Sequence, residues 1–599
     1  MVLLRYGPVL AVVLLAGVTA SPVAGDTASS QPGPAMEFRV NRQRAAAVKD
    51  AFKIAWDGYY KYAFPKDQLN PQTNDGANTR NGWGASAVDA LSTAIVMEDK
   101  DIVKQIIDYV PKINFNQTTD SVSLFETTIR YLGGLLAGYD LLEGPFSHLS
   151  SDKNAKAALL KQAKNLADDL SFAFNTPTGI PSNTLILAEQ SLGGDTTNGL
   201  ATIGTLVLEW VHLSDLLGDK KYGALAEKAE SYLLKPKPGI GEPFPGLLGT
   251  NVYLANGSFA DSFGGWVGGD DSYYEYLIKM WAYDSSRFGL YKDRWIAAAD
   301  STIKYLASNP SSRPDLTFLA VYNGQKLIYE SEHLACFAGG NFILGGLVLG
   351  EKKYTDFGIK LTTACHETYT GTATGIGPEI FDWIPSTCKN TGPQAPPTYE
   401  PPAYEPPSYV KRSPKLSASP EASPDAYNRI ANDSPPPATL TVVTPPSTST
   451  PPSTPPAKPD PCALPTLYND QTAFYNKTGF YITDANYDLR PEVVESIYYA
   501  YRVTGDPKYQ EWAWNAFLAI NSTTRVGSGY SQVKNVNVKG GGGFTNNQES
   551  FFFAELMKYL YLIHSEDGMW QVNYKGRNEY VYNTEAHPFK VAGKALPTY

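Results

Sequence analysis

The sequence predicts an all-α protein, a toroid of helical hairpins that forms one large domain. The first observation is helical periodicity, because several long segments carry apolar residues at three- and four-residue spacing. Some of these segments are apolar nearly all round, which is typical of helices buried on both sides. The five clearest segments are residues 122–142, 201–219, 272–283, 491–506 and 549–565.

A faint internal repeat is the second observation. Residues 217–222, 349–354 and 504–509 share a glycine, an acidic residue and a Lys-Tyr pair in this order. The glycine is suited to cap one helix, and the acid–Lys–Tyr segment after it is suited to open the next. This recurring helix–turn–helix unit indicates one large domain, although length alone would suggest about four.

One break in composition interrupts the helical pattern. Residues 391–460 hold 20 of the 44 prolines of the chain and cannot form a packed core, so a disordered insert is expected. The insert could separate two domains or interrupt one, and we favour an interruption because a disulfide between Cys388 and Cys462 would close its base. The predicted boundaries are a flexible segment at 21–40 and one discontinuous domain at 41–390 and 461–595.

The N-terminus predicts entry into the secretory pathway. Residues 1–20 combine one arginine, an apolar run and small residues near Ala20, which is the pattern of a cleaved signal peptide. A retained signal anchor is the alternative, but no other apolar run approaches the roughly 20 residues of a spanning helix. We expect a secreted monomer without a stable membrane span, in which the four cysteines pair. Glycosylation sequons fit this route and occur at Asn116, Asn256, Asn432, Asn476 and Asn521.

Charge and motifs exclude several classes of function. The formal net charge of −10 and the pI near 5.3 argue against a nucleic-acid partner, which favours a basic patch. The six histidines form no HExxH zinc motif, and the chain has no GxSxG nucleophile elbow. The 39 tyrosines suit carbohydrate contact as well as packing.

Acidic residues recur at the predicted starts of four helices. They are Glu126, Asp270, Asp271, Glu492 and Glu549. Capping explains any one of them, since Ser123 and Glu126 match a capping box and the helix dipole favours acids in first turns. If the inner helices of a toroid run parallel, however, their N-termini converge on one end. The carboxylates would then meet there with Arg130 and Arg490 in one cavity.

Two carboxylates with a water between them are the machinery of inverting glycoside hydrolysis. Glu492 lies at a helix start beside Arg490 and should stay ionised, which suits a general base. Glu126 is the candidate acid, but an acid needs a raised pKa, and both the capping position and Arg130 would lower it. The sequence leaves the assignment of acid and base open.

The C-terminal segment EYVYNTEAHPF, residues 579–589, predicts a short strand with an unusually polar end. Tyr580, Tyr582 and Thr584 alternate and therefore share one face of the strand. If the acidic helix starts share one cavity, the polar end of this strand is the candidate for the floor of that cavity.

Six motifs along the chain resemble one known family. They are SLFETTIRYLGGLL, GGDDSYYEYLIKM, HLACFAGGN, LRPEVVESIYYA, ESFFFAELMKYLYL and YNTEAHPF. In this order they resemble the class I α-1,2-mannosidases of glycoside hydrolase family 47, and most of all the secreted fungal branch. The resemblance runs from about residue 45 to about residue 590, outside the proline-rich insert.

The resemblance implies a fold and an activity. The fold is an (αα)7 barrel that a C-terminal β-hairpin plugs from one end, which agrees with the helical hairpins. The activity is inverting exo-hydrolysis of terminal α-1,2-linked mannose on high-mannose N-glycans, with a Ca²⁺ ion in the site.

The resemblance also implies roles for single residues. Glu126 matches a general acid that acts through a water, Glu492 a general base, and Asp271 a third essential carboxylate. Thr584 matches the calcium ligand through its hydroxyl and carbonyl oxygens, with waters and sugar hydroxyls completing the shell. The residues that match the sugar subsite are Arg130, His333, Arg490, Phe551, Glu555 and Glu585.

Two further points follow from the resemblance. Cys336 and Cys365 match the disulfide of the family. Thr202 stands where many members carry an acid, so an altered branch preference is expected. The main alternative is a lectin-like protein of the same family that binds high-mannose glycans with little or no hydrolysis. A toroid hydrolase of plant or cell-wall polysaccharide is the third possibility.

Overall fold

The computed structural model describes residues 38–118, 120–388 and 471–598. The predicted signal peptide, most of the predicted flexible segment and the predicted insert lie outside these ranges. Cys462 also lies outside them, so its pairing with Cys388 stays a prediction. The described chain is predominantly helical, as the apolar periodicity indicates.

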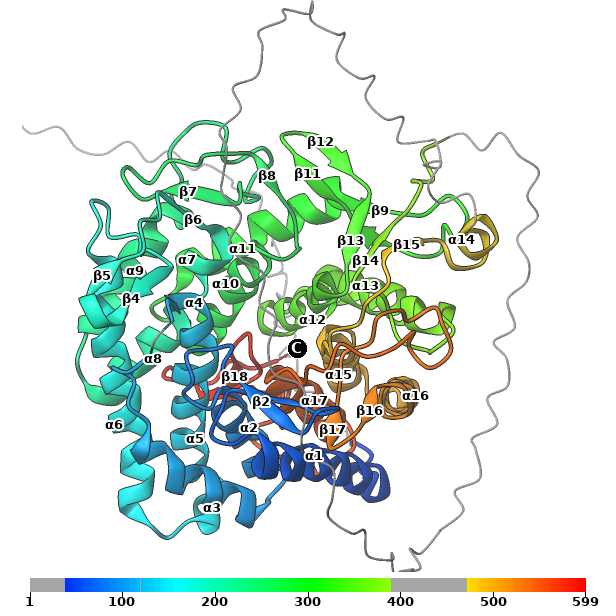
Figure 1. The fold of residues 1–599 in the computed structure, drawn as a ribbon. Helices are drawn as coiled ribbons and strands as arrows, with labels where there is room; N and C mark the ends of the chain where they lie inside the picture. The colour runs from blue at the N-terminus through cyan, green and yellow to red at the C-terminus, as the bar shows by residue number, and fades with distance from the viewer. Residues whose placement is uncertain (1–37, 119, 389–470, 599) are drawn as a thin grey trace, which may run out of the picture.

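An inner set of seven helices within the described residues makes a closed series of contacts. Each of them packs against the next along the chain, and the last packs against the first. In Figure 1 they surround the C-terminal hairpin, whose strand β18 lies near the centre. The seven are α2 (Ala85–Val96), α5 (Gly133–Glu143), α8 (Val207–Leu217), α10 (Asp271–Tyr283), α12 (Phe337–Leu349), α15 (Glu492–Thr504) and α17 (Met557–Leu562). Every residue of α2 is buried, which explains a sequence that is apolar nearly all round.

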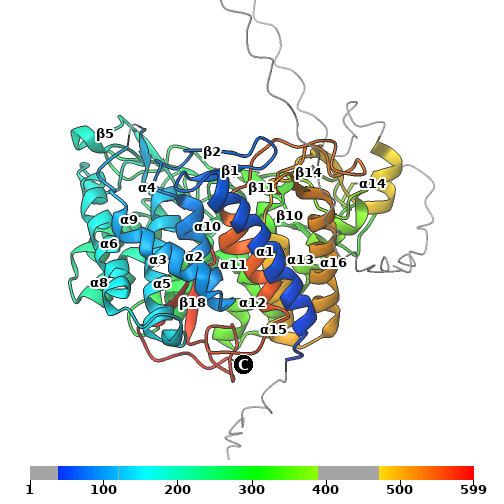
Figure 2. The same ribbon diagram turned by 60° about the horizontal axis from the view of Figure 1, so that its bottom comes forward.

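An outer helix packs against each inner helix. The outer helices bury one face only; α3, for example, buries Ile102, Val103, Ile106 and Ile107. Figure 2 shows the helices running side by side, with short strands such as β1, β2 and β14 at one end and β18 at the other. The outer set is α1 (Arg42–Tyr62), α3 (Lys100–Tyr109), α6 (Lys153–Leu170), α9 (Lys221–Leu234), α11 (Gly289–Ser301), α13 (Lys352–Gly371) and α16 (Pro507–Thr524).

The sequence repeat marks the connections between inner and outer helices, as predicted. Gly218, Gly350 and Gly505 each end an inner helix in the left-handed conformation, with φ of 68°, 71° and 63°. The tyrosine that follows ties neighbouring outer helices together. Tyr222 donates a hydrogen bond to Asp168 at the end of α6, at 2.8 Å.

Three of the predicted helices differ from the observed ones, two of them in their first turns. Residues 122–142 begin as β3 (Val122–Ser123) and α4 (Leu124–Glu126), and a π-type turn, η2 (Thr127–Leu132), precedes α5. Residues 549–565 likewise begin with a π-type turn, η9 (Phe552–Leu556), before α17. A π-type turn adds one residue to a helical turn, and such turns are frequent at functional sites.

The third difference is a break in the predicted helix over residues 201–219. The helix divides into α7 (Leu200–Gly204) and α8. The backbone leaves the helical region at Thr205, whose hydroxyl donates to the Ser272 hydroxyl in the first turn of α10 at 2.8 Å. This tertiary contact outweighs the local apolar pattern. Leu200–Leu217 is long and apolar enough to cross a membrane by length and composition alone, but 78% of it is buried inside the protein.

Short antiparallel strands connect the helices and were not predicted from the sequence, except near the C-terminus. They pair in two- and three-stranded sheets. Their bounds are β1 (Gln68–Asn70), β2 (Asp75–Ala77), β4 (Thr184–Ile186), β5 (Ser191–Leu192), β6 (Thr197–Gly199), β7 (Asn251–Tyr253), β8 (Phe263–Gly264), β9 (Ala307–Ser308), β10 (Phe318–Leu319), β11 (Val321–Asn323), β12 (Lys326–Ile328), β13 (Glu330–Glu332), β14 (Ile380–Asp382), β15 (Tyr481–Asp484), β16 (Arg525–Val526) and β17 (Gly529–Tyr530), with the short helix α14 (Thr472–Thr478) before β15.

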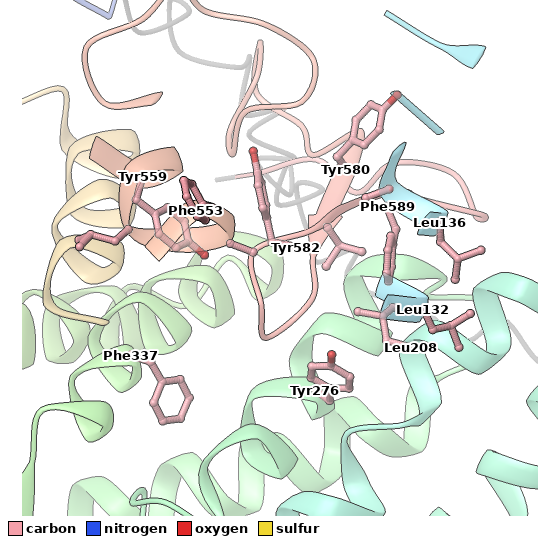
Figure 3. Close-up of a cluster of buried hydrophobic side chains, with 14 of the residues drawn as sticks. Leu132, Leu136, Leu208, Tyr276, Phe337, Phe553, Tyr559, Tyr580, Tyr582 and Phe589 are labelled. Atoms are coloured by element: carbon pink, nitrogen blue, oxygen red, sulfur yellow. The ribbon is translucent and has the colours of Figure 1, made fainter. Parts of the chain in front are cut away.

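The C-terminal hairpin enters the space between the inner helices. Its strands β18 (Tyr580–Tyr582) and β19 (Pro588–Lys590) pair with Val581 opposite Phe589. Figure 3 shows Phe589 beside Leu132 of η2 and Leu136 of α5, and Tyr582 near the aromatic side chains of η9 and α17. The strand predicted at residues 580–584 exists over Tyr580–Tyr582 only, and its aromatic residues fill the core, whereas Thr584 lies in the turn that follows.

One hydrophobic core joins the two described parts of the chain on either side of residues 389–470. It runs from Val48 in α1 to Phe589 in β19. The disulfide between Cys336 and Cys365, implied by the family resemblance, is present and ties the start of α12 to α13.

Candidate active site

A cavity of about 400 Å³ lies where the inner helices begin. The first turns of α4, α10 and α15 line its wall, and the turn of the C-terminal hairpin closes its floor. Nine of the ten residues proposed from the sequence line it together: Glu126, Arg130, Asp271, Arg490, Glu492, Phe551, Glu555, Thr584 and Glu585. The helix starts thus converge on one cavity, as the toroid hypothesis requires.

Glu492 is held at the first position of α15, one residue after Pro491. Its Oε2 atom lies 2.8 Å from Nδ1 of His333, and its Oε1 atom lies 3.9 Å from Nη1 of Arg490. His333 does not line the cavity; it lies behind Glu492, where its Nε2 atom is 2.8 Å from the Tyr369 hydroxyl. Burial raises the pKa of Glu492, but the hydrogen bond and charge of His333 and the charge of Arg490 outweigh it and hold the pKa below its usual value.

Glu126 faces two arginines. Its Oε2 atom accepts from Nε of Arg130 at 2.7 Å and from Nε of Arg80 at 3.3 Å, while its own N–H donates to the Ser123 hydroxyl at 3.3 Å. Half of the predicted capping box is therefore present, and the carboxylate itself turns to the arginines. Burial raises the pKa of Glu126, but the two arginines outweigh burial and lower the pKa below its usual value.

Asp271 has the opposite environment at the first position of α10. Burial is the main cause that raises its pKa to about 8; the nearby carboxylates of Glu332, Glu275 and Glu492 act in the same direction, and one backbone hydrogen bond opposes them. Among the three proposed catalytic carboxyls, Asp271 alone therefore holds its proton near neutral pH. Carboxyls whose environments separate their pKa values in this way are typical of acid–base sites.

The raised pKa of Asp271 makes stability dependent on pH. In the unfolded chain this carboxyl ionises near its ordinary value of 3.8, whereas the folded protein keeps the proton up to about 8. Between these two values the unfolded state loses a proton that the folded state retains, so stability falls as pH rises. We expect Asp271→Asn to raise the unfolding temperature relative to the parent protein, by a margin that grows from pH 4 to pH 8. Differential scanning fluorimetry in the presence of chelator measures this margin.

A matched control is Asp57→Asn, at an exposed aspartate on the outer helix α1. The difference in unfolding temperature between Asp57→Asn and the parent protein should not change with pH. A margin for Asp271→Asn that is flat across the same range would contradict the buried, protonated carboxyl.

The floor of the cavity is the turn at residues 583–587, which several inner helices hold. The Asn583 side chain donates to the carbonyl of Ile129 in η2 at 2.9 Å and to Oε1 of Glu209 in α8 at 2.8 Å. The buried Lys279 of α10 donates to the Asn583 carbonyl at 3.2 Å. The same asparagine accepts from the N–H of Glu585 at 2.9 Å, which fixes the bend of the turn.

The rest of the turn is anchored to α10 again and to two more helices, α17 and α2. The N–H of Thr584 donates to the Tyr276 hydroxyl of α10 at 3.2 Å. The buried Lys558 of α17 donates to the Ala586 carbonyl, and the His587 Nδ1 atom lies 2.9 Å from the Ser92 hydroxyl of α2. Because side chains of several inner helices hold the turn by hydrogen bonds, it presents Thr584 to the cavity in one fixed orientation.

The donor set around Thr584 suits a hard cation. Its hydroxyl and carbonyl oxygens accept no hydrogen bond within the described residues, and the residue lines the cavity. Nine carboxyl side chains and three arginines line the same cavity, so it carries an excess of oxygen donors and of negative charge. No group of three His, Cys, Asp or Glu side chains could hold a metal directly in the part of the chain that the structure describes. A cation here would therefore take Thr584 and water as its ligands.

Several cavity residues were missed by the sequence analysis. Glu275 and Glu495 lie one helical turn after Asp271 and Glu492, on the same face, so helical spacing could have found them. Arg80 comes from a loop with no periodic signal, and its contact with Glu126 depends on long-range packing. Thr202, noted as a departure from the family pattern, lines the cavity as well.

Comparison with known proteins places these features in one family. Residues 51–591 match glycosyl hydrolase family 47. A probable mannosyl-oligosaccharide α-1,2-mannosidase 1B of Aspergillus clavatus is 50% identical over 92% of this chain and 93% of its own. A mannosyl-oligosaccharide α-1,2-mannosidase of Coccidioides posadasii is 48% identical over 98% of this chain and 99% of its own.

A solved structure extends the likeness to the fold. The α-1,2-mannosidase from Trichoderma reesei is 46% identical, with a TM-score of 0.78 over 92% of this chain and 100% of that one. Sequence and fold agree along nearly the whole chain, so this protein is an enzyme that belongs to glycosyl hydrolase family 47.

Proposed function

We propose that this enzyme is an exo-acting α-1,2-mannosidase that removes terminal α-1,2-linked mannose from high-mannose N-glycans. The observation that carries the proposal is the cavity. It holds the ionised carboxylate of Glu492 at the start of α15 and the protonated carboxyl of Asp271 at the start of α10, and the hairpin turn closes its floor. A cavity closed at one end accepts the end of a glycan rather than its middle. The relatives named as α-1,2-mannosidases support the choice of linkage.

The proposed reaction inverts the anomeric centre in a single displacement. Glu492 accepts a proton from a water molecule, and the water oxygen forms a bond to the anomeric carbon of the mannose. The bond from this carbon to the glycosidic oxygen breaks, and a protonated carboxyl gives its proton to that oxygen. The first-formed product is β-mannose, which proton NMR of an early time point distinguishes from the α-anomer.

The pKa directions favour Asp271 as the proton donor. Asp271 keeps a proton at neutral pH, whereas Glu126 is ionised between Arg80 and Arg130. The family resemblance gives the acid role to Glu126, acting through a water. Glu126 can take that role only if sugar binding draws the two arginines away from it. We therefore assign Glu126 to orienting the arginines and water in the resting site.

We further propose that Thr584 holds a Ca²⁺ ion at the floor of the cavity. Calcium prefers six to eight oxygen ligands, and the two free oxygens of Thr584 with waters and sugar hydroxyls would provide them. When bound, the ion would supply positive charge that orients the hydroxyl groups of the terminal sugar. Glu555 and Glu585, which line the same cavity, would balance that charge.

The finer points of fold and location are also proposals. The closed series of seven inner helices, each with an outer partner, supports an (αα)7 barrel plugged by the hairpin. The pattern of residues 1–20 and the five sequons support secretion, as a monomer and without a stable membrane span. The low pI supports glycan partners rather than nucleic acid.

Release of mannose from a Man9 N-glycan tests the proposed function. We expect free mannose, loss of hydrolysis with EDTA, and recovery when Ca²⁺ is restored. Binding without release would establish the lectin-like alternative in place of the enzyme. Activity on β-glucans that resists chelation would instead indicate the polysaccharide hydrolase.

A further inference from the structure

Glu379 lies behind the wall of the cavity, immediately before β14, and is 8% exposed. It does not line the cavity, yet it contacts two segments that supply site residues, residues 488–490 and His333. Its Oε2 atom accepts from Nε of Arg490 at 2.5 Å, and its Oε1 atom accepts from the N–H of Asp488 at 3.0 Å. Its carbonyl oxygen accepts from the N–H of His333 at 2.8 Å.

Both side chains that contact the carboxylate of Glu492 are thus anchored by this one residue. His333 reaches Oε2 of Glu492 at 2.8 Å, and Arg490 approaches Oε1 only to 3.9 Å. His333 is fixed through the backbone of Glu379, while Arg490 is fixed through its side chain. A substitution of the Glu379 side chain therefore removes the anchor of Arg490 and leaves the anchor of His333, a backbone carbonyl, in place.

The two carboxylates compete for one guanidinium. Arg490 can form a close, charge-assisted pair with either Glu379 or Glu492. The distances of 2.5 Å and 3.9 Å show that Glu379 holds it. Because His333 already occupies Oε2 of Glu492, Oε1 is the oxygen that remains to accept a proton from water. A guanidinium paired closely with Oε1 would occupy that position.

We propose that Glu379 is a positioning residue that retains Arg490 and thereby keeps Oε1 of Glu492 open to the attacking water. Glu379 does not contact the reacting atoms and acts only through Arg490. The proposal rests on the proposed function of Glu492 as general base. The proposal assigns an effect on kcat to a residue that lies outside the cavity.

The test is a double-mutant cycle on the full-length enzyme, with mannose release from a Man9 glycan as the assay. Glu379→Gln keeps the size and one acceptor oxygen but removes the charge that retains Arg490. We expect kcat to fall about 10- to 100-fold, the cost of misplacing a group near the reaction centre. In the Arg490→Met background no guanidinium is left to retain, so adding Glu379→Gln should cause no further loss.

Glu242→Gln is the matched control. Glu242 also accepts from an arginine, Nη1 of Arg294 at 2.9 Å, and from a backbone N–H, that of Gly246 at 2.7 Å, but it lies away from the cavity. We expect this control to leave kcat unchanged. Unfolding temperatures of all variants show whether any loss of activity reflects loss of fold.

Three outcomes would overturn the inference. One is parent-like kcat in Glu379→Gln. Another is an equal loss from Glu379→Gln in the parent and in the Arg490→Met background, which would make the two residues independent. The third is a fall in unfolding temperature that accounts for the lost activity. If instead the parent enzyme releases no mannose, the proposed function fails and the inference fails with it, so the two failures are distinguishable.

Discussion

Glu492→Gln is expected to lower kcat about 100- to 10,000-fold while leaving the fold intact. The range is that of a lost general base. Glutamine has the shape of glutamate and keeps an oxygen for the hydrogen bond from His333, so the packing at the start of α15 is preserved. It cannot accept a proton from water, and the rate should fall without a comparable rise in KM. Steady-state kinetics on a Man9 glycan measure both constants.

The surroundings of Glu492 explain why the ionised form is available. Although the residue is buried, the hydrogen bond and charge of His333 and the charge of Arg490 hold its pKa below the usual value. Glu492, the proposed base, is therefore ionised above about pH 4.5, the ordinary value for a glutamate. We expect the acidic limb of the kcat/KM profile to lie at or below this pH.

Glu230→Gln is the control for replacing a buried glutamate by glutamine away from the cavity. Glu230 is a buried glutamate on the outer helix α9, and burial raises its pKa well above the usual value, so it is already neutral. Its substitution should leave kcat unchanged. Retention of at least a tenth of the parent kcat by Glu492→Gln would remove this residue from the role of base.

Helical periodicity was enough to predict most of the cavity wall. A helix places each residue at a fixed angle, so an acid in the first turn of a buried helix points to the end where the other inner helices begin. Glu126, Asp271 and Glu492 were found in this way, and the same reasoning could have reached Glu275 and Glu495. The start of α15 was misjudged by one residue, since Pro491 precedes the helix rather than opening it.

Residues carried by loops could not be predicted from the same pattern. Arg80 meets Glu126, and Glu379 meets Arg490, only because distant segments fold against each other. Their positions depend on the packing of the whole domain. The spacing of residues within one segment carries no information about that packing. His333 illustrates a related limit: its importance followed from the family resemblance, but its place behind Glu492 followed only from the structure.

The π-type turns mark another limit of periodicity. One extra residue in a turn shifts the register of every residue after it, but a local pattern of apolar residues remains helical. Arg130 lies in η2 and Glu555 in η9, and both line the cavity. The irregular turns thus occur where the helices carry site residues.

Thr584→Ala is expected to weaken Ca²⁺ binding at least about 10- to 100-fold, a loss that even outer-shell partners of metal ligands produce. The substitution removes the hydroxyl and leaves only the carbonyl oxygen as a protein ligand. Activity should fall with it at a fixed, low Ca²⁺ concentration. The rise in unfolding temperature on addition of Ca²⁺ gives a readout that does not depend on catalysis.

Thr584→Ser is the matched variant, because it keeps the hydroxyl and loses only a methyl group. We expect it to bind Ca²⁺ within a few-fold of the parent protein. Equal stabilisation of the Ala variant and the parent by Ca²⁺ would show that the ion, if bound, does not use this hydroxyl.

The fold should survive Thr584→Ala, and the reason lies in how the turn is held. Its anchors are the side chain of Asn583 and the carbonyls that Lys279 and Lys558 reach, whereas Thr584 contributes only its backbone N–H, to Tyr276. Alanine keeps that N–H. The unfolding temperature of the metal-free variant should therefore match that of the metal-free parent, and only the response to Ca²⁺ should differ. A lower temperature without metal would mean that the hydroxyl supports the turn itself, and the metal assignment would lose its basis.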